Sequence, residues 1–146
     1  MNGIKLRGLG RCVPAQSVTN DDLAKTVDTS DAWITARTGI RSRRRCTEET
    51  HTELCVTAAR RALAQAGITP ADIGACIVAT VSADTIVPSA ACMLQRELGM
   101  PEDTPCFDLN AACTGFIYAL HTMECLLNAA PRKFGLVVGA EALSKV

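Results

Sequence analysis

The chain has 146 residues, a formal net charge of zero, and a composition that is 48% hydrophobic and 21% charged. This length fits one domain with a real core, and the composition excludes a disordered chain. Zero net charge and few aromatic side chains argue against a nucleic-acid-binding protein, which needs a basic face and stacking surfaces. We therefore expect a single domain over residues 1–146.

No targeting or membrane-spanning segment is visible in the sequence. Residues 1–15 contain basic side chains and lack the continuous apolar stretch of a signal peptide. The longest apolar region, residues 73–94, is interrupted by Asp84 and Pro88, so it falls short of the ~18 clean apolar residues that cross a bilayer. We expect a cytoplasmic location, where the eight cysteines stay reduced. No Cys/His spacing is that of a zinc site, so no metal is expected.

The first 27 residues are expected to hold one strand and one short helix. Residues 4–9 alternate apolar with basic or small residues, the period-two pattern of a strand. Asn20 has a side chain typical of a helix N-cap, and two aspartates follow it at the positive end of the helix dipole. We therefore predict a helix that begins at Asn20 and runs to about Val27.

A second short helix is predicted over residues 31–38. Ser30 is expected to cap its N-terminus, and Gly39 is expected to end it. The stretch that follows, residues 41–50, is polar and arginine-rich, which is typical of an exposed loop.

Residues 51–66 show the clearest helical pattern. An apolar face is formed by four residues at helical spacing, Leu54, Ala58, Ala62 and Ala66. Gly67 and Pro70 are expected to end this helix. The run 75–81 is continuously apolar, which is typical of a strand buried on both faces.

The second half of the chain predicts further alternating helices and strands. Pro88 suits the first turn of a helix that reaches Leu98. Residues 105–110 form the next predicted strand, a helix over 113–128 follows after a very short turn, and 134–140 form a last buried strand. Because strands and helices alternate, we predict an α/β fold with a mostly parallel sheet and helices on both faces.

The segment 107–116 carries the most informative pattern. A buried strand ends there, small residues allow a sharp turn, and Cys113 stands at the start of a helix, where free N–H groups and the helix dipole favour a thiolate. Gly115 and the preceding alanines are expected to leave room for a substrate. This setting predicts that Cys113 is a nucleophile. The alternative is a small buried cysteine packed like an alanine.

The remaining cysteines and the histidines have weaker settings. Packing inside strands or a helix is the better interpretation for Cys76, Cys106 and Cys125. His51 opens one predicted helix and His121 lies inside another, and a structural role is expected for both.

Two motifs give the chain a specific resemblance to a known family. FDLNAACTGF over residues 107–116 and DTSDAWITARTGIR over 28–41 closely resemble β-ketoacyl-acyl carrier protein synthase III, the initiating condensing enzyme of bacterial fatty acid synthesis. Shorter matches stand at residues 20–23, 88–92 and 137–141. The implied fold is one half of the thiolase fold, α/β, with a mostly parallel mixed sheet and helices on both faces.

The resemblance implies roles for five residues. Cys113 would accept an acyl group from acyl-coenzyme A, and thioester-to-thiol exchange would keep that group activated. Thr29, Trp33 and Arg37 match positions at the coenzyme A entrance, the Trp against the adenine and the others near polar groups. Without the resemblance, Trp33 is better interpreted as a half-buried anchor and Arg37 as a solvated charge. Val87 matches a position that shapes the acyl pocket across a dimer interface, where a residue smaller than the frequent Phe would admit a longer primer.

The resemblance also implies that the site is incomplete in these 146 residues. The family completes it with a His and an Asn in the second half of a much longer chain, and neither His51 nor His121 matches that His. We therefore expect the N-terminal half, either a fragment or one subunit of a split enzyme, inactive alone and paired as a homodimer or with the missing half. Acyl-coenzyme A and acyl carrier protein are the expected partners. No cofactor, membrane or nucleic acid is expected.

Three functions follow from these observations. The first is condensation of an acyl-coenzyme A, acetyl-coenzyme A above all, with malonyl-acyl carrier protein. The second is that of an acyltransferase or a polyketide- or quinolone-type condensing enzyme of the same superfamily. The third is a non-catalytic half that supports a partner subunit, against which the intact motif over residues 111–116 counts.

Overall fold

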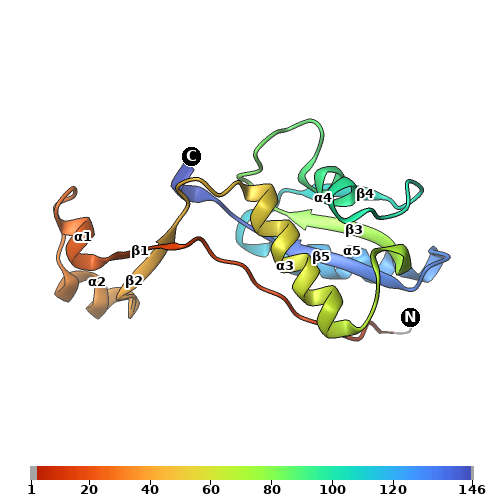
Figure 1. The fold of residues 1–146 in the computed structure, drawn as a ribbon. Coiled ribbons are helices and arrows are strands. Elements are labelled where there is room, and N and C mark those ends of the chain that lie inside the picture. The colour runs from red at the N-terminus through yellow and green to blue at the C-terminus, as the bar shows by residue number, and fades with distance from the viewer. Residues whose placement is uncertain (1–2, 146) are drawn as a thin grey trace.

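The computed structural model describes residues 3–145 and divides them between a body and an arm (Figure 1). The body contains a three-stranded sheet and the helices α3, α4 and α5. The arm is a two-stranded ribbon that carries the short helices α1 and α2 and extends to one side of the body.

The sheet of the body is parallel throughout. Strand β3 (Ile73–Ala79) lies at its centre, with β4 (Cys106–Leu109) on one side and β5 (Phe134–Gly139) on the other. The three strands predicted here are confirmed, although β3 begins two residues before the predicted 75–81. All of its residues are buried, as the continuous apolar run predicts.

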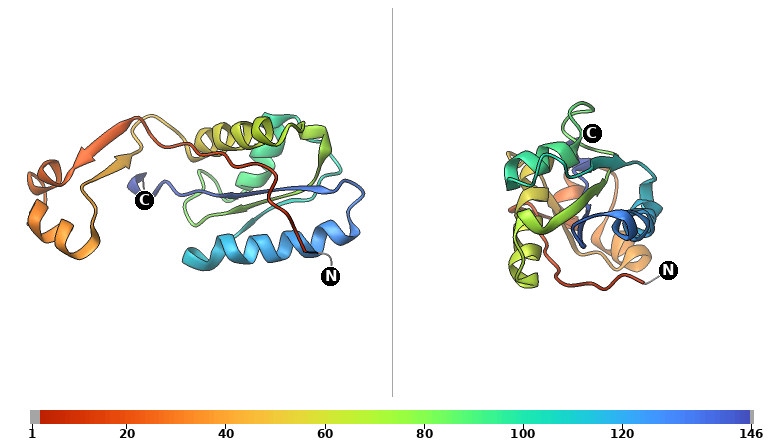
Figure 2. Two further views of the ribbon diagram at one scale, coloured as in Figure 1. Left: turned by 90° about the horizontal axis from the view of Figure 1, so that it is seen from below. Right: turned by 90° about the vertical axis from the view of Figure 1, so that its right-hand side faces the viewer.

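Alternate residues of β3 contact opposite layers of the body. Val78 belongs to an apolar cluster with α3 (His51–Ala66) and α4 (Ala90–Leu98), whereas Ile77 belongs to a cluster with α5 (Gly115–Ala129). Figure 2 shows α3 and α4 over one face of the sheet and α5 over the other. The predicted parallel sheet with helices on both faces is therefore confirmed.

Local signals set the ends of α3 and α4. Thr50 caps α3 through a capping box with Glu53, and Gly67 ends the helix with φ of +67°. Ser89 caps α4, so Pro88 precedes that helix instead of standing in its first turn as predicted. The Ser89 hydroxyl accepts a hydrogen bond from a free N–H of the first turn, which makes this residue the better start.

The arm is held together by two strands that the sequence pattern does not predict. Strands β1 (Gln16–Thr19) and β2 (Ser42–Arg45) pair antiparallel, with Thr19 opposite Ser42. The predicted exposed loop over 41–50 is therefore wrong for its first half. Arginine side chains are compatible with β2 because most of this ribbon is exposed to solvent.

Helix α1 (Asn20–Ala24) begins and ends differently from its prediction. Thr19, not Asn20, is the N-cap, because Thr19 and Asp22 form a reciprocal capping box. Asn20 is instead the first helical residue and is buried, with its side-chain amide donating to the carbonyl oxygen of Ile40 at 2.8 Å. The helix also stops at Ala24, before the predicted end near Val27.

Residues 3–14 form no strand, so the strand predicted over 4–9 is wrong. The segment runs along α3, and it approaches so closely that a Cβ at Gly8 or Gly10 would overlap the carbonyl oxygens of Ala62 and Ala58. A strand requires a hydrogen-bonding partner along its edge. The segment instead faces β5 across an open space.

That space is a groove of about 920 Å³. Residues 3–14 and the unpaired edge of β5 line it, together with the inner sides of α3 and α5. Its lining includes apolar side chains such as Leu63, Met123 and Leu127. The body therefore leaves part of its apolar interior uncovered.

Candidate active site

Cys113 lies in the turn between β4 and α5, at the carboxyl edge of the parallel sheet. A single 3-10 turn, Ala112–Thr114, joins the two elements, so the thiol precedes α5 instead of opening it as predicted. Ala112 has φ of +45°, a backbone conformation that residues with a side chain rarely adopt and that often marks functional sites. The thiol is exposed. The carboxyl edge of a parallel sheet is where such folds bind ligands.

The first turn of α5 has no side-chain cap. Thr114 stands at its N-cap position, but the Thr114 hydroxyl donates to the carbonyl oxygen of Ala111 at 2.9 Å instead of accepting from the helix. The N–H groups that follow Cys113 donate within the turn: that of Thr114 to the carbonyl oxygen of Ala111 at 3.2 Å, and that of Gly115 to the carbonyl oxygen of Ala112. Gly115 is buried, and a Cβ there would lie 3.4 Å from the Cβ of Ala79. This is ordinary van der Waals contact, so the predicted role of Gly115 in leaving room for a substrate stays a prediction.

The other thiols differ from Cys113 in exposure. Cys76 is buried, and its hydrogen bond with Cys106 and its burial raise the pKa of the Cys76 thiol. Burial also raises the pKa of Cys55 to about 12. Cys106 is half-buried, whereas Cys125 is exposed on α5, contrary to the packed position predicted for it. Among the eight thiols, Cys113 and Cys125 are the two that solvent reaches freely.

Neither histidine faces Cys113. His51 is completely buried, and its Nε2 lies 3.0 Å from the hydroxyl of Thr80 and 3.1 Å from the carbonyl oxygen of Ala140. His121 is exposed on α5. The structure brings no imidazole into hydrogen-bond contact with the Cys113 thiol among the described residues.

The residues predicted for the coenzyme A entrance lie in or next to α2 (Asp31–Thr38). This helix is confirmed as predicted, with Ser30 as its N-cap. The guanidinium of Arg37 stacks over the ring of Trp33 at 4.4 Å from its centroid, and the indole remains 53% exposed. The preceding Thr29 is half-buried.

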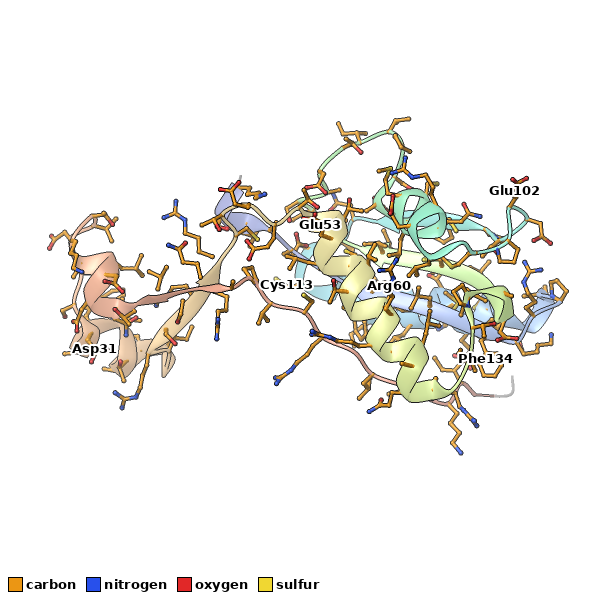
Figure 3. The ribbon with its side chains drawn as sticks, in the orientation of Figure 1. Asp31, Glu53, Arg60, Glu102, Cys113 and Phe134 are labelled. Atoms are coloured by element: carbon orange, nitrogen blue, oxygen red, sulfur yellow. The ribbon has the colours of Figure 1, made fainter. Side chains whose placement is uncertain are left out.

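These arm residues and Cys113 are not brought together. Figure 3 labels Asp31, the first residue of α2, at the far end of the arm, while Cys113 lies in the body. Val87 lies in a third place, in the loop between β3 and α4, where it is 85% exposed. The 146 residues therefore present the predicted site residues on three separate surfaces.

Three carboxylates at the carboxyl edge of the sheet were missed by the sequence analysis. Asp84 accepts from the backbone N–H groups of His51 and Thr52, and Asp108 accepts from those at the start of α4. Glu141 follows β5 and bonds the residues that follow β3. An acid inside an apolar strand could have drawn attention to Asp108, but nothing local distinguishes Asp84 or Glu141 from solvated charges.

The hydrogen bonds of Asp84 predict how the stability of the protein depends on pH. Partial burial raises the pKa of Asp84, but hydrogen bonds from Thr52 and His51 outweigh it and hold the pKa below its ordinary value. The ionised carboxylate thus contributes stability above the unfolded pKa of about 3.9, and this contribution disappears as the pH falls through the lower folded pKa. We expect Asp84→Asn to lower the melting temperature at pH 6, with the gap from wild type narrowing towards pH 3. An equal gap at both pH values in thermal scans would contradict this assignment.

Within residues 3–145, no three His, Cys, Asp or Glu side chains gather closely enough to hold a metal ion. None of the helices in that range is both long and apolar enough to cross a membrane.

Solved structures with the same fold define the class of this protein. The chain superposes on 3-oxoacyl-[acyl-carrier-protein] synthase III from Aquifex aeolicus with a TM-score of 0.92 and 43% identity, over 98% of this chain and 46% of that one. The priming β-ketosynthase of the R1128 polyketide pathway gives a TM-score of 0.91 and 35% identity, over 97% and 42%. The chain therefore has a thiolase-like α/β fold of the kind found in condensing enzymes.

Sequence comparison relates the chain to one family within this class of condensing enzymes. The family described as 3-oxoacyl-[acyl-carrier-protein (ACP)] synthase III matches residues 107–146. The β-ketoacyl-[acyl-carrier-protein] synthase III of Clostridium acetobutylicum is 47% identical over all 146 residues, and that of Neisseria meningitidis is 46% identical over 147 aligned positions. The resemblance to β-ketoacyl-acyl carrier protein synthase III is confirmed along the whole chain, which spans about 45% of the length of these relatives.

Proposed function

We propose that these residues form the N-terminal half of a condensing enzyme that joins acyl-coenzyme A, acetyl-coenzyme A above all, to malonyl-acyl carrier protein. The product is a 3-oxoacyl-acyl carrier protein, and carbon dioxide is released. The observation that carries this proposal is the exposed Cys113 thiol in a strained turn at the carboxyl edge of the sheet, inside the family-matched residues 107–146. Relatives that share this stretch are named for the same reaction.

The proposed first step is acyl transfer. The Cys113 thiolate attacks the thioester carbonyl, the bond to the coenzyme A sulfur breaks, and coenzyme A leaves as a thiol after taking up a proton. Cys113 lies directly before the N-terminus of α5, where the helix dipole supports negative charge on the attacking sulfur. The N–H of Cys113 itself is one proposed donor to the oxyanion.

The arm supplies the proposed coenzyme A contacts. Trp33 has an exposed indole face for the adenine, and Arg37 has a guanidinium that suits phosphate. In this arrangement the stacked pair must come near Cys113 when the enzyme is complete. We therefore propose that the remaining part of the enzyme bridges the arm and the body. Cytoplasmic thiols stay reduced, which suits a free nucleophilic cysteine.

Labelling with acetyl-coenzyme A tests the nucleophile. We expect Cys113 to take about 3-fold more acetyl label than Cys125, which is also exposed. The ratio is modest because a helix terminus that favours the thiolate also lowers its nucleophilicity. Peptide mass spectrometry measures both sites in one sample. Cys113→Ala should remove the excess label and Cys125→Ala should not. Label spread evenly over both thiols would overturn the assignment.

The apolar groove gives a separate prediction about assembly. Because the groove of about 920 Å³ exposes the interior between α3 and α5, we expect the chain to associate through an apolar interface of roughly 2,000 Å². Sedimentation at micromolar concentration should therefore show species larger than a monomer. A single sharp monomer with cooperative unfolding would contradict this expectation.

A polyketide-type condensing enzyme is the second candidate. The TM-score of 0.91 with the R1128 priming β-ketosynthase favours it, although the identity of 35% is lower than with the Aquifex aeolicus structure. The two candidates differ in the carrier protein that accepts the acyl group. The genes next to this one, for fatty acid or for polyketide synthesis, separate them.

A further inference from the structure

The loop between β3 and α4 projects from the body beyond the carboxyl end of β3 (Figure 1). Ile86 and Val87 at its tip are 95% and 85% exposed. A projecting loop without burial of its own is mobile unless its ends are held. The position of the tip therefore depends on the contacts at the two ends of residues 80–89.

Glu141 holds the beginning of the loop. Its carboxylate accepts from the N–H of Val81 at 3.0 Å, from the hydroxyl of Thr80 at 3.4 Å, and from the hydroxyl of Ser82. The hydroxyl oxygen of Ser82 in turn accepts a hydrogen bond from the backbone N–H of Ala142 at 2.8 Å. These bonds connect the ends of β3 and β5 across about sixty residues of sequence.

His51 orients the hydroxyl that faces Glu141. A carbonyl oxygen can only accept a hydrogen bond, so Nε2 of His51 must carry a proton to bond the carbonyl oxygen of Ala140. The same nitrogen lies 3.0 Å from the hydroxyl oxygen of Thr80. Thr80 also accepts from the N–H of Ser82 at 3.2 Å. The Thr80 proton is therefore left for the Glu141 carboxylate.

Two further carboxylates hold the rest of the loop. Asp84 accepts from the N–H of Thr52 at 2.8 Å and thereby fastens the middle of the loop to the start of α3. Asp108 accepts from the first N–H groups of α4 at 2.8 Å and fastens its far end. Across the tip, the hydroxyl of Thr85 donates to the carbonyl oxygen of Pro88 at 2.9 Å and encloses Ile86 and Val87 in a tight turn.

We infer that Glu141 is a positioning residue for acyl-chain selection: it fixes the base of the 80–89 loop and, through it, the place of Val87. The inference rests on the proposed function and on the family resemblance, which implies that Val87 shapes the acyl pocket across a dimer interface. Glu141 touches no substrate in this role. Its carboxylate acts through the backbone of Val81 and the hydroxyls beside it.

Hydrogen exchange of the complete 146-residue chain tests the positioning role. In Glu141→Ala, the amides of Val81 and Ser82 should exchange at least ~10-fold faster than in wild type, because Glu141 and Thr80 accept their hydrogen bonds, while those of β3 change little. Glu102→Ala is the matched control, because Glu102 is an exposed acid remote from the loop (Figure 3). Glu141→Gln keeps an acceptor for the Val81 N–H, so it should restore part of the protection against exchange. If the alanine variant does not fold, the exchange of Glu141→Gln is compared with wild type instead.

The results separate positioning from plain structural support and from the proposed function. Equal acceleration in β3 and the loop, or no acceleration in either, would overturn the inference. The ratio of octanoyl to acetyl label on Cys113 should shift at least ~3-fold in Glu141→Ala. An unchanged ratio with a loosened loop would overturn the link to acyl selection. Absence of any Cys113 label in wild type would overturn the proposed function and leave the exchange result standing.

Discussion

The purified 146-residue chain is expected to form no measurable 3-oxoacyl product from acetyl-coenzyme A and malonyl-acyl carrier protein. Decarboxylation of the malonyl group develops negative charge on an enolate, and the loss of one donor to such an oxyanion typically costs ~10²–10³-fold in rate. The resemblance places a His, an Asn and a backbone donor of the family in residues outside this chain. Several such losses together bring the rate below detection.

The assay needs material free of a host condensing enzyme. A chain carrying Cys113→Ala, purified in the same way, reports any contaminating activity. Turnover that disappears in Cys113→Ala would show that the chain completes the site by itself, and would contradict the expected need for a second half.

Replacing Gly74 by valine is expected to destabilise the body strongly. Gly74 lies in β3 and is buried, and a Cβ there would overlap the backbone carbonyl of Arg132. Arg132 cannot move aside cheaply, because its guanidinium donates to the carbonyl oxygen of Ile73 at 2.7 Å and pairs with Asp103 at 2.9 Å. We expect a loss of at least ~4 kcal/mol in the free energy of unfolding, a large share of the ~5–15 kcal/mol that stabilises a typical domain.

Urea unfolding followed by circular dichroism measures this loss. Gly3→Ala is the control, because a Cβ at Gly3 meets no atom within 4 Å. A folded Gly74→Val chain with wild-type stability would mean that Arg132 and its segment are not held as described.

The parts of the fold that local chemistry determines are those that the sequence predicted. The helix over residues 51–66 carries its own cap, its apolar face and a terminal glycine, so its ends agree with the structure. The continuous apolar run of β3 marks a strand buried on both faces, whatever its neighbours are. Helix α2 likewise has its cap and its terminal glycine within ten residues of each other.

The failures concern segments whose structure depends on a distant partner. Strand β2 is arginine-rich and forms only because β1 lies beside it, and the sequence alone does not reveal this pairing. The segment 4–9 has the alternation of a strand but has no paired edge next to it. Hydrogen-bond partners, not side-chain pattern, decide both cases.

The candidate site likewise contains residues that the local sequence predicts and residues that it does not. Cys113 was predicted from a strand, small residues and a helix that are contiguous in sequence, and the structure has it exposed in that turn. Glu141, Asp84 and Asp108 acquire their partners only when separate elements meet, so no spacing in the sequence points to them. Trp33 and Arg37 stack on each other but lie far from Cys113, and only the family resemblance connects them to its chemistry.

We propose that this chain supplies the nucleophile of a condensing enzyme and that a second half supplies the rest of the site. The most direct measurement mixes the chain with the non-overlapping part of the Clostridium acetobutylicum relative, confirms by sedimentation that the two associate, and follows 3-oxoacyl-acyl carrier protein by mass spectrometry. We predict product from the associated pair, and none from either part alone or from a pair carrying Cys113→Ala. An associated pair that forms no product, or one that forms as much product with Cys113→Ala, would contradict the claim.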